Sequence, residues 1–143
     1  MNQSIELLRD IVRTARDGDE GIRLVMEKTN DTAFREALLS EQEQYQAVER
    51  DAGRRLIGMG DRAEPESMMA RVGMKMGVGM QTMTDRSTAH LANLIIQGST
   101  MGVTEMTRSR NEHGEADEES RALCDRLIKL QQDAIERAKG FLA

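Results

Sequence analysis

The chain has 143 residues, 31% of them charged, a formal net charge of −5, 2% aromatic residues and a single proline. This length suits one domain with a real core and is too short for two comparable ones, so residues 1–143 are expected to form a single domain. Scattered Lys and Arg with few aromatics argue against nucleic-acid binding. No apolar run approaches the length of a transmembrane span, and the N-terminus is unlike a signal peptide, so a cytoplasmic all-α protein is expected.

The first expected helix runs from Ile5 to Thr29, because its apolar residues recur every three or four positions. Asp19 falls on this apolar stripe, where a hydrophobic residue is expected. Gly18 and Gly21 flank it and loosen the helix, so a hydrated Asp19 is the default interpretation. The stripe consists of Ile5, Leu8, Val12, Ala15, Ile22 and Met26.

A second helix is expected from Phe34 to Met59, after a capping break at residues 30–32. Its apolar stripe also contains one acid, Glu41, and Tyr45 follows one turn later. The short turn between the two helices makes them antiparallel neighbours, so positions whose numbers sum to about 61 lie at the same height.

Acidic residues of the two helices are therefore expected at the same height along the helical hairpin. Asp19 and Glu20 should lie opposite Gln42 and Glu41. Two carboxylates that face each other inside a bundle repel unless they are protonated, hydrated or bridged by a cation. Glu20 lies about 100° away from the Asp19 stripe, so hydration is the simpler expectation for it.

The next segment is rich in methionine and glycine and is expected to form a short, soft helix packed against the bundle. Packing in the core or between subunits is the favoured interpretation. A groove for a protein partner, a thioether site for copper(I) and an interfacial membrane contact are the alternatives. Its methionines are Met68, Met69, Met74, Met76, Met80 and Met83, six of the 11 in the chain.

A third helix is expected from a cap at Thr84 or Asp85 to about His113, and a fourth after a cap at Asp117. Gly98 and Gly102, four residues apart, would let a neighbouring helix approach closely. Glu105 lies one turn after Met101 and is a candidate inward-facing acid, and Cys124 on the last apolar stripe is interpreted as a buried structural thiol. Four long helices without strands predict an up-down four-helix bundle.

The segment from Leu8 to Gly21 resembles a ferritin-like bacterial four-helix-bundle family of unknown function, whose first helix carries a D-G-x-x-G signature. The resemblance continues through the turn at Asn30-Asp31 and returns at Gln97-Gly98-Ser99-Thr100, where the family has R-G-E-D. It implies that the bundle is ferritin-like.

Ferritin-like di-iron bundles carry a Glu on two helices and an E-x-x-H motif on the other two, and this chain departs from that pattern. Gln44 stands where the first histidine would be, and Ser99 stands at the position of a carboxylate. Gln131 and Ala134 replace the second E-x-x-H motif. A site without these ligands should bind iron poorly.

We therefore expect a non-catalytic module without a cofactor, which forms a homo-oligomer or binds a protein partner, the latter at the Met-rich segment. The alternative is a carboxylate-bridged iron or manganese protein, or an oxidase, with a degenerate di-metal site. In that alternative Asp19, Glu20 and Glu41 bind the ion, Tyr45 lies beside it, and Glu105 is an outside candidate. No motif for hydrolase or transferase chemistry is present.

Overall fold

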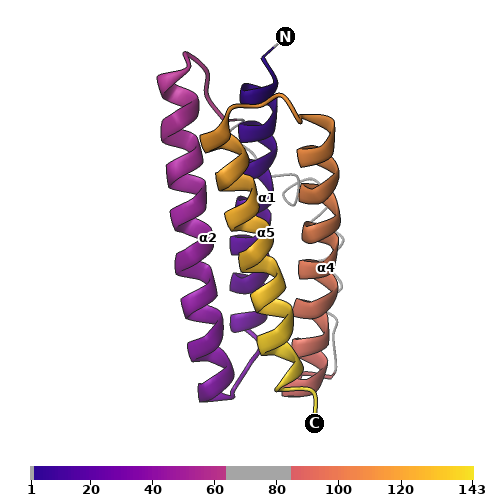
Figure 1. Ribbon diagram of the computed structural model, residues 1–143. Coiled ribbons are helices and arrows are strands. Elements are labelled where there is room, and N and C mark those ends of the chain that lie inside the picture. The colour runs from indigo at the N-terminus through magenta and orange to yellow at the C-terminus, as the bar shows by residue number, and fades with distance from the viewer. Residues whose placement is uncertain (1, 64–84) are drawn as a thin grey trace.

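The computed structural model describes residues 2–63 and 85–143 and contains four α-helices in that part of the chain (Figure 1). They are α1 (Gln3–Met26), α2 (Thr32–Gly58), α4 (Thr88–Glu112) and α5 (Glu118–Lys139). The described residues form no strand, as expected for an all-α fold. The predicted Met-rich helix lies outside the described residues. None of the described helices is long and apolar enough to cross a membrane.

Side-chain caps set where the helices begin. Asp31 and Asp117 cap α2 and α5 as predicted, because their carboxylates accept hydrogen bonds from the free N–H groups of the first turn. The predicted start of α4 at Thr84 or Asp85 is wrong, since Ser87 is the cap and its hydroxyl accepts from the His90 N–H at 3.2 Å. Asp85 instead accepts from the Ser87 N–H at 2.9 Å.

Contacts between helices show that the expected up-down order is wrong for α4. Asp19 bonds to Gln42 and Arg16 to Glu49, so α2 runs antiparallel to α1. Ser109 bonds to Asp10 and His113 lies beside Glu6, so α4 also runs antiparallel to α1. Hence α2 and α4 are parallel, and α4 begins at the end of the bundle opposite to the one where α2 finishes (Figure 1). A long connection permits this arrangement, whereas a short loop would force α4 to return antiparallel to α2.

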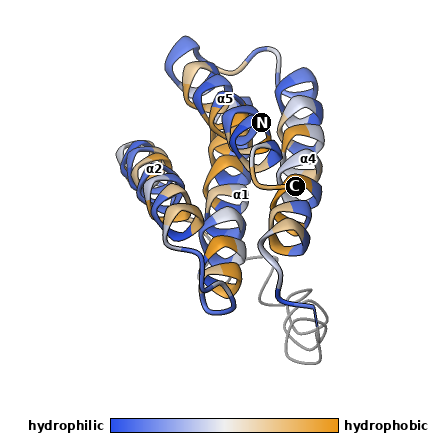
Figure 2. Cartoon of the chain, turned by 90° about the horizontal axis from the view of Figure 1, so that it is seen from below, coloured by the Kyte–Doolittle hydropathy of each residue, from blue (hydrophilic) through white to orange (hydrophobic). Residues whose placement is uncertain are grey.

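The helices enclose one apolar core, with α1 and α5 in contact and with α2 and α4 on opposite sides of that pair (Figure 1). Viewed along the bundle, α1 lies in the middle and much of its ribbon carries hydrophobic residues (Figure 2). Phe34 and Phe141 close one end, with ring centroids 5.0 Å apart. The largest fully buried side chains include Leu7, Leu8, Ile11, Leu38, Leu56, Leu91, Met106 and Leu127.

Replacing Asp117 with Ala is expected to lower the free energy of unfolding by about 1–2 kcal/mol. The substitution removes the acceptor of the Ser120 N–H, at 2.7 Å, and the ion pair with Arg55, at 3.1 Å. Urea denaturation measures the loss. Glu118→Ala, an exposed change in the same turn that leaves the cap in place, is the control and should cost only a few tenths of a kcal/mol. Equal losses would contradict the capping role.

Candidate functional site

Four of the polar side chains that are buried in the described part of the chain form what we call the polar layer. Glu41 and Tyr45 come from α2, Ser99 from α4 and Gln131 from α5. Their exposed fractions are 2%, 3%, 9% and 2%, respectively. Buried polar groups normally have hydrogen-bond partners, so the partners of each member decide what the layer can do.

Glu41 makes the one ion pair of the polar layer. The Arg137 Nε donates to its Oε2 at 3.2 Å, which ties the first half of α2 to the end of α5. The Glu41 side chain is 3% exposed, whereas that of Arg137 is 41% exposed. Among the described residues, Oε1 of Glu41 is buried without a hydrogen-bond partner. This oxygen of Glu41 has therefore lost its hydration without gaining a hydrogen bond from the protein, which costs free energy.

The surroundings of Glu41 favour its protonated form. Burial raises the pKa of Glu41 from its ordinary value of 4.5 to about 7, against the opposing charge and hydrogen bond of Arg137. Arg137 lies at the rim, where solvent screens its charge, so it offsets only part of the desolvation cost. The side chain therefore changes its charge close to neutral pH.

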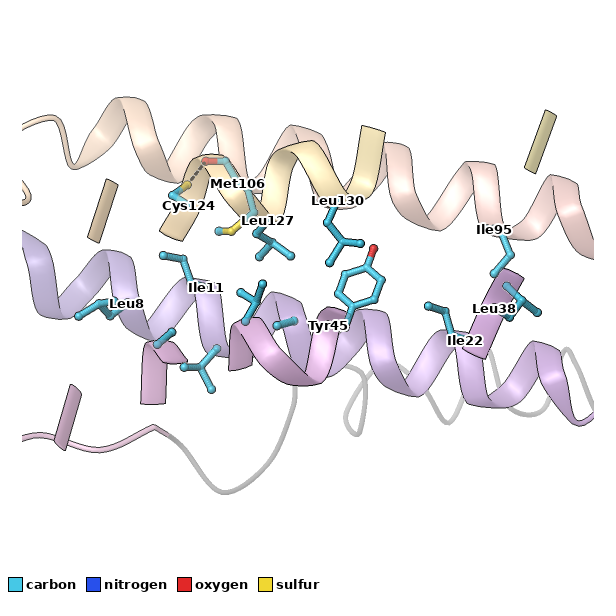
Figure 3. Close-up of a cluster of buried hydrophobic side chains, with 14 of the residues drawn as sticks. Leu8, Ile11, Ile22, Leu38, Tyr45, Ile95, Met106, Cys124, Leu127 and Leu130 are labelled. Carbon is cyan, nitrogen blue, oxygen red and sulfur yellow. Dashed lines mark hydrogen bonds between the residues drawn. The ribbon is translucent and has the colours of Figure 1, made fainter. Parts of the chain in front are cut away.

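Tyr45 reaches across the interior from α2 with its hydroxyl pointing away from its own helix (Figure 3). The Ser99 side chain on α4 lies close enough to the phenol to oppose the rise of the Tyr45 pKa. Burial, followed by the charge of Glu41, raises the pKa of Tyr45 above its ordinary value. The phenol therefore stays neutral at physiological pH, which suits a structural hydrogen bond and does not suit proton transfer.

Gly18 on α1 makes room for the Tyr45 ring. A Cβ at position 18 would lie 2.5 Å from Cε1 and 2.7 Å from Cδ1 of Tyr45. This distance is shorter than van der Waals contact, so only glycine lets the ring pass so close to α1. The glycine of the D-G-x-x-G signature thus has a packing role in this chain.

Gly102 on α4 likewise leaves space for the side chain of Gln131 on α5. Its side-chain amide occupies the place that a Cβ on Gly102 would take, and its Oε1 is buried without a partner among the described residues. The predicted close approach at the glycine pair therefore occurs at Gly102, through a side chain of α5. At Gly98 a Cβ would meet nothing within 4 Å.

The predicted metal-ligand candidates outside the polar layer have partners on the protein surface or near it. Asp19 is partly buried and accepts a hydrogen bond from the Gln42 Nε2 at 2.8 Å, at the predicted level of the hairpin. Glu20 pairs with Arg23, and Glu105, which was considered as an inward-facing acid, is exposed and pairs with Arg108. In the described part of the chain, no three His, Cys, Asp or Glu side chains are grouped to hold a metal ion.

Cys124 is fully buried, as its place on the apolar stripe predicted. Its Sγ donates to the carbonyl oxygen of Met106 at 3.6 Å (Figure 3). Burial, together with the charge of Asp125, raises the pKa of this thiol to about 12. A thiol that stays protonated in the core is not a nucleophile, so its role is packing between α4 and α5.

A second polar cluster, between α1 and α4, escaped the sequence analysis. The Ser109 hydroxyl donates to Asp10 Oδ2 at 2.6 Å, and His113 Nε2 lies 3.2 Å from Glu6 Oε2. His113 Nδ1 lies 2.7 Å from the Ser109 carbonyl oxygen, so that nitrogen carries a hydrogen and cannot accept the Ser109 proton. The cluster therefore joins two helices and does not activate the serine. The residues that it joins lie about 100 positions apart in the chain, so no local sequence pattern predicts the cluster.

Comparison with known proteins supports the fold. No protein-family model matches the chain, and no curated protein matches it. The chain is similar to the crystal structure of a DUF305 fragment from Deinococcus radiodurans, with a TM-score of 0.76 and 15% sequence identity. The match covers 99% of this chain and 96% of that chain. At this identity the likeness shows the all-helical fold alone.

Replacing Glu41 with Gln is expected to raise the free energy of unfolding at pH 8 by roughly 2–3 kcal/mol. The folded-state pKa is raised, so the stability that protonated Glu41 contributes is fully present below pH 4.5 and is lost as the pH rises through about 7. Urea denaturation of wild type and variant at pH 5 and pH 8 measures the difference, which should grow with pH. Glu43→Gln, an exposed change on the same helix, is the control and should show no such growth. Parallel pH profiles for all three proteins would contradict the prediction.

Replacing Gly18 with Ala is expected to cost about 1–3 kcal/mol, because the new methyl overlaps the buried Tyr45 ring. Gly53→Ala on α2, where a Cβ meets nothing within 4 Å, is the matched control and should stabilise by up to about 1 kcal/mol. The cost of Gly18→Ala should shrink in a Tyr45→Leu background, which a double-mutant cycle measures. An unchanged cost in that background would show that the ring is not what excludes a side chain at position 18.

Proposed function

We propose that this chain is a non-catalytic four-helix module that works by binding another protein chain, either a second copy or a partner. The observation that carries the proposal is the uncharged outer side of α4. No charged residue occurs from Ser87 to Thr104, in a chain that is 31% charged. Charge depletion together with exposed methionine is typical of the centre of protein interfaces.

The interior supports a structural role. Tyr45 and Cys124 stay protonated, and the Ser109 hydroxyl donates to Asp10, a carboxylate that is too weak a base to deprotonate a serine. Glu41 is the one described interior acid with a pKa near neutrality, and Arg137 already neutralises one of its oxygens. Catalysis needs several groups directed at one reacting atom, whereas Glu41 bonds to Arg137 at the rim and Gln131 packs against Gly102.

Descent from a ferritin-like bundle is part of the proposal. The parallel α2 and α4, joined by one long connection, match the connectivity of ferritin-like folds. The positions that the family resemblance assigns to metal ligands, at Glu41, Ser99 and Gln131, all lie in the polar layer. A serine and a glutamine at two of these positions leave a ligand set that holds iron or manganese poorly. The module would thus keep the fold of a metal protein without its chemistry.

Metal analysis tests the proposal. Protein purified without chelator and then titrated with iron(II), manganese(II) and zinc(II) is expected to retain less than stoichiometric metal, because Glu41 is the only carboxylate in the polar layer. Glu41→Ala and the exposed control Glu43→Ala should titrate like wild type. One equivalent of iron or manganese bound by wild type and by Glu43→Ala, and lost in Glu41→Ala, would overturn the non-catalytic proposal in favour of a carboxylate metal site.

A further inference from the structure

We infer that the partner is a second copy of this chain, docked across a two-fold axis on the exposed uncharged face of α4, which we call the α4 face. This inference rests on the proposed function and names its partner. The α4 face consists of exposed residues only, namely Asn93, Gln97, Gly98, Thr100, Met101 and Thr104.

Charge favours this face over every other described helix surface. Near a two-fold axis each residue lies opposite the same or a neighbouring residue of the second copy, so a charged residue at the centre of such an interface meets its own sign. Two chains of net charge −5 repel one another wherever acids come together. The charged residues of α4 all follow Thr104, whereas α1, α2 and α5 carry charges along their whole length.

Shape makes the α4 face complementary to itself. Gly98 and Met101 lie three residues apart and are therefore neighbours on one side of the helix. The space above Gly98 is open, and the Met101 side chain is 69% exposed. A two-fold axis between them places each Met101 over the Gly98 of the other copy, which lets the helix axes approach to about 8 Å. Gly102 has no such space, because Gln131 of the same chain already fills it.

The polar members of the face tolerate burial. The Thr100 hydroxyl donates to the Ile96 carbonyl oxygen at 2.7 Å, and the Thr104 hydroxyl donates to the Thr100 carbonyl oxygen at 3.0 Å. Their protons therefore have acceptors before docking, which lowers the cost of removing water. The amides of Asn93 and Gln97 each offer donors and an acceptor, so they can bond to polar groups of the second copy.

Sedimentation equilibrium of the full chain tests the inference. One helix face is smaller than the roughly 800 Å² per partner of a standard interface, so the dimer should be weak and should dissociate reversibly as the protein is diluted over about 1–500 µM. Wild type is expected to shift from 16.0 kDa to twice that mass with concentration. Met101→Lys should stay monomeric, because it places two like charges near the axis. Ile57→Lys on α2 is the matched control, since Ile57 is also 69% exposed, and it should dimerise like wild type.

Two further variants separate docking from folding. Gly98→Leu fills the open space on the helix, so it should raise the melting temperature of the monomer while it weakens the dimer at least about tenfold. Met101→Glu alone should be monomeric. An equimolar mixture of Met101→Glu with Met101→Lys should recover dimer, because the two opposite charges then lie close together beside the axis.

Dimerisation lost in Met101→Lys and Gly98→Leu and kept in Ile57→Lys would support the inference. A wild type that is monomeric throughout, or a Met101→Lys variant that still dimerises, would overturn it. Either of those outcomes leaves the proposed function standing, with a different partner or a different face. Stoichiometric metal binding would overturn the proposed function whatever the oligomeric state.

Discussion

The close contact between the Tyr45 ring and the backbone of Gly18 is the constraint on which the polar layer depends. It brings α1 and α2 near enough for a single aromatic side chain to cross the core and reach Ser99 on α4. Because α2 and α4 lie on opposite sides of the bundle, the approach of Tyr45 to Ser99 connects two helices that otherwise make little contact. Tyr45 is the one tyrosine in a chain with only 2% aromatic residues, and its side chain spans the interior of the bundle.

Glu41 shows that the interior is not built for stability alone. A buried carboxylate with one unpartnered oxygen costs more than its screened pair with Arg137 returns, so an uncharged amide is expected to serve the fold better near neutral pH. Ser99 and Gln131, the other buried members of the polar layer on α4 and α5, are uncharged, so Glu41 is the layer's one acid, and a single carboxylate holds a metal ion poorly.

The outer surfaces of the four described helices differ in charge, which bears on the proposed binding role. Three helices carry ion pairs and scattered charges, which favour a hydrated exterior. The outer side of α4 is free of charge up to Thr104 and combines an open glycine with an exposed methionine. This contrast within one small bundle is the physical reason for assigning the binding role to α4.

Periodicity and capping residues predicted the four long helices, a cap within residues 30–32, the cap at Asp117 and the burial of Cys124, because these features depend on neighbours within a few turns. The short turn of the first hairpin predicted that Asp19 lies opposite Gln42, because a short turn fixes the register of two antiparallel helices. The parallel course of α4, the pairing of Glu41 with Arg137 and the occupation of Gly102 by Gln131 depended on the tertiary structure. Those contacts join residues far apart in the chain, so a local sequence pattern does not predict them. The direction of a helix after a long connection is set by how the helix packs, which the sequence of that helix does not specify.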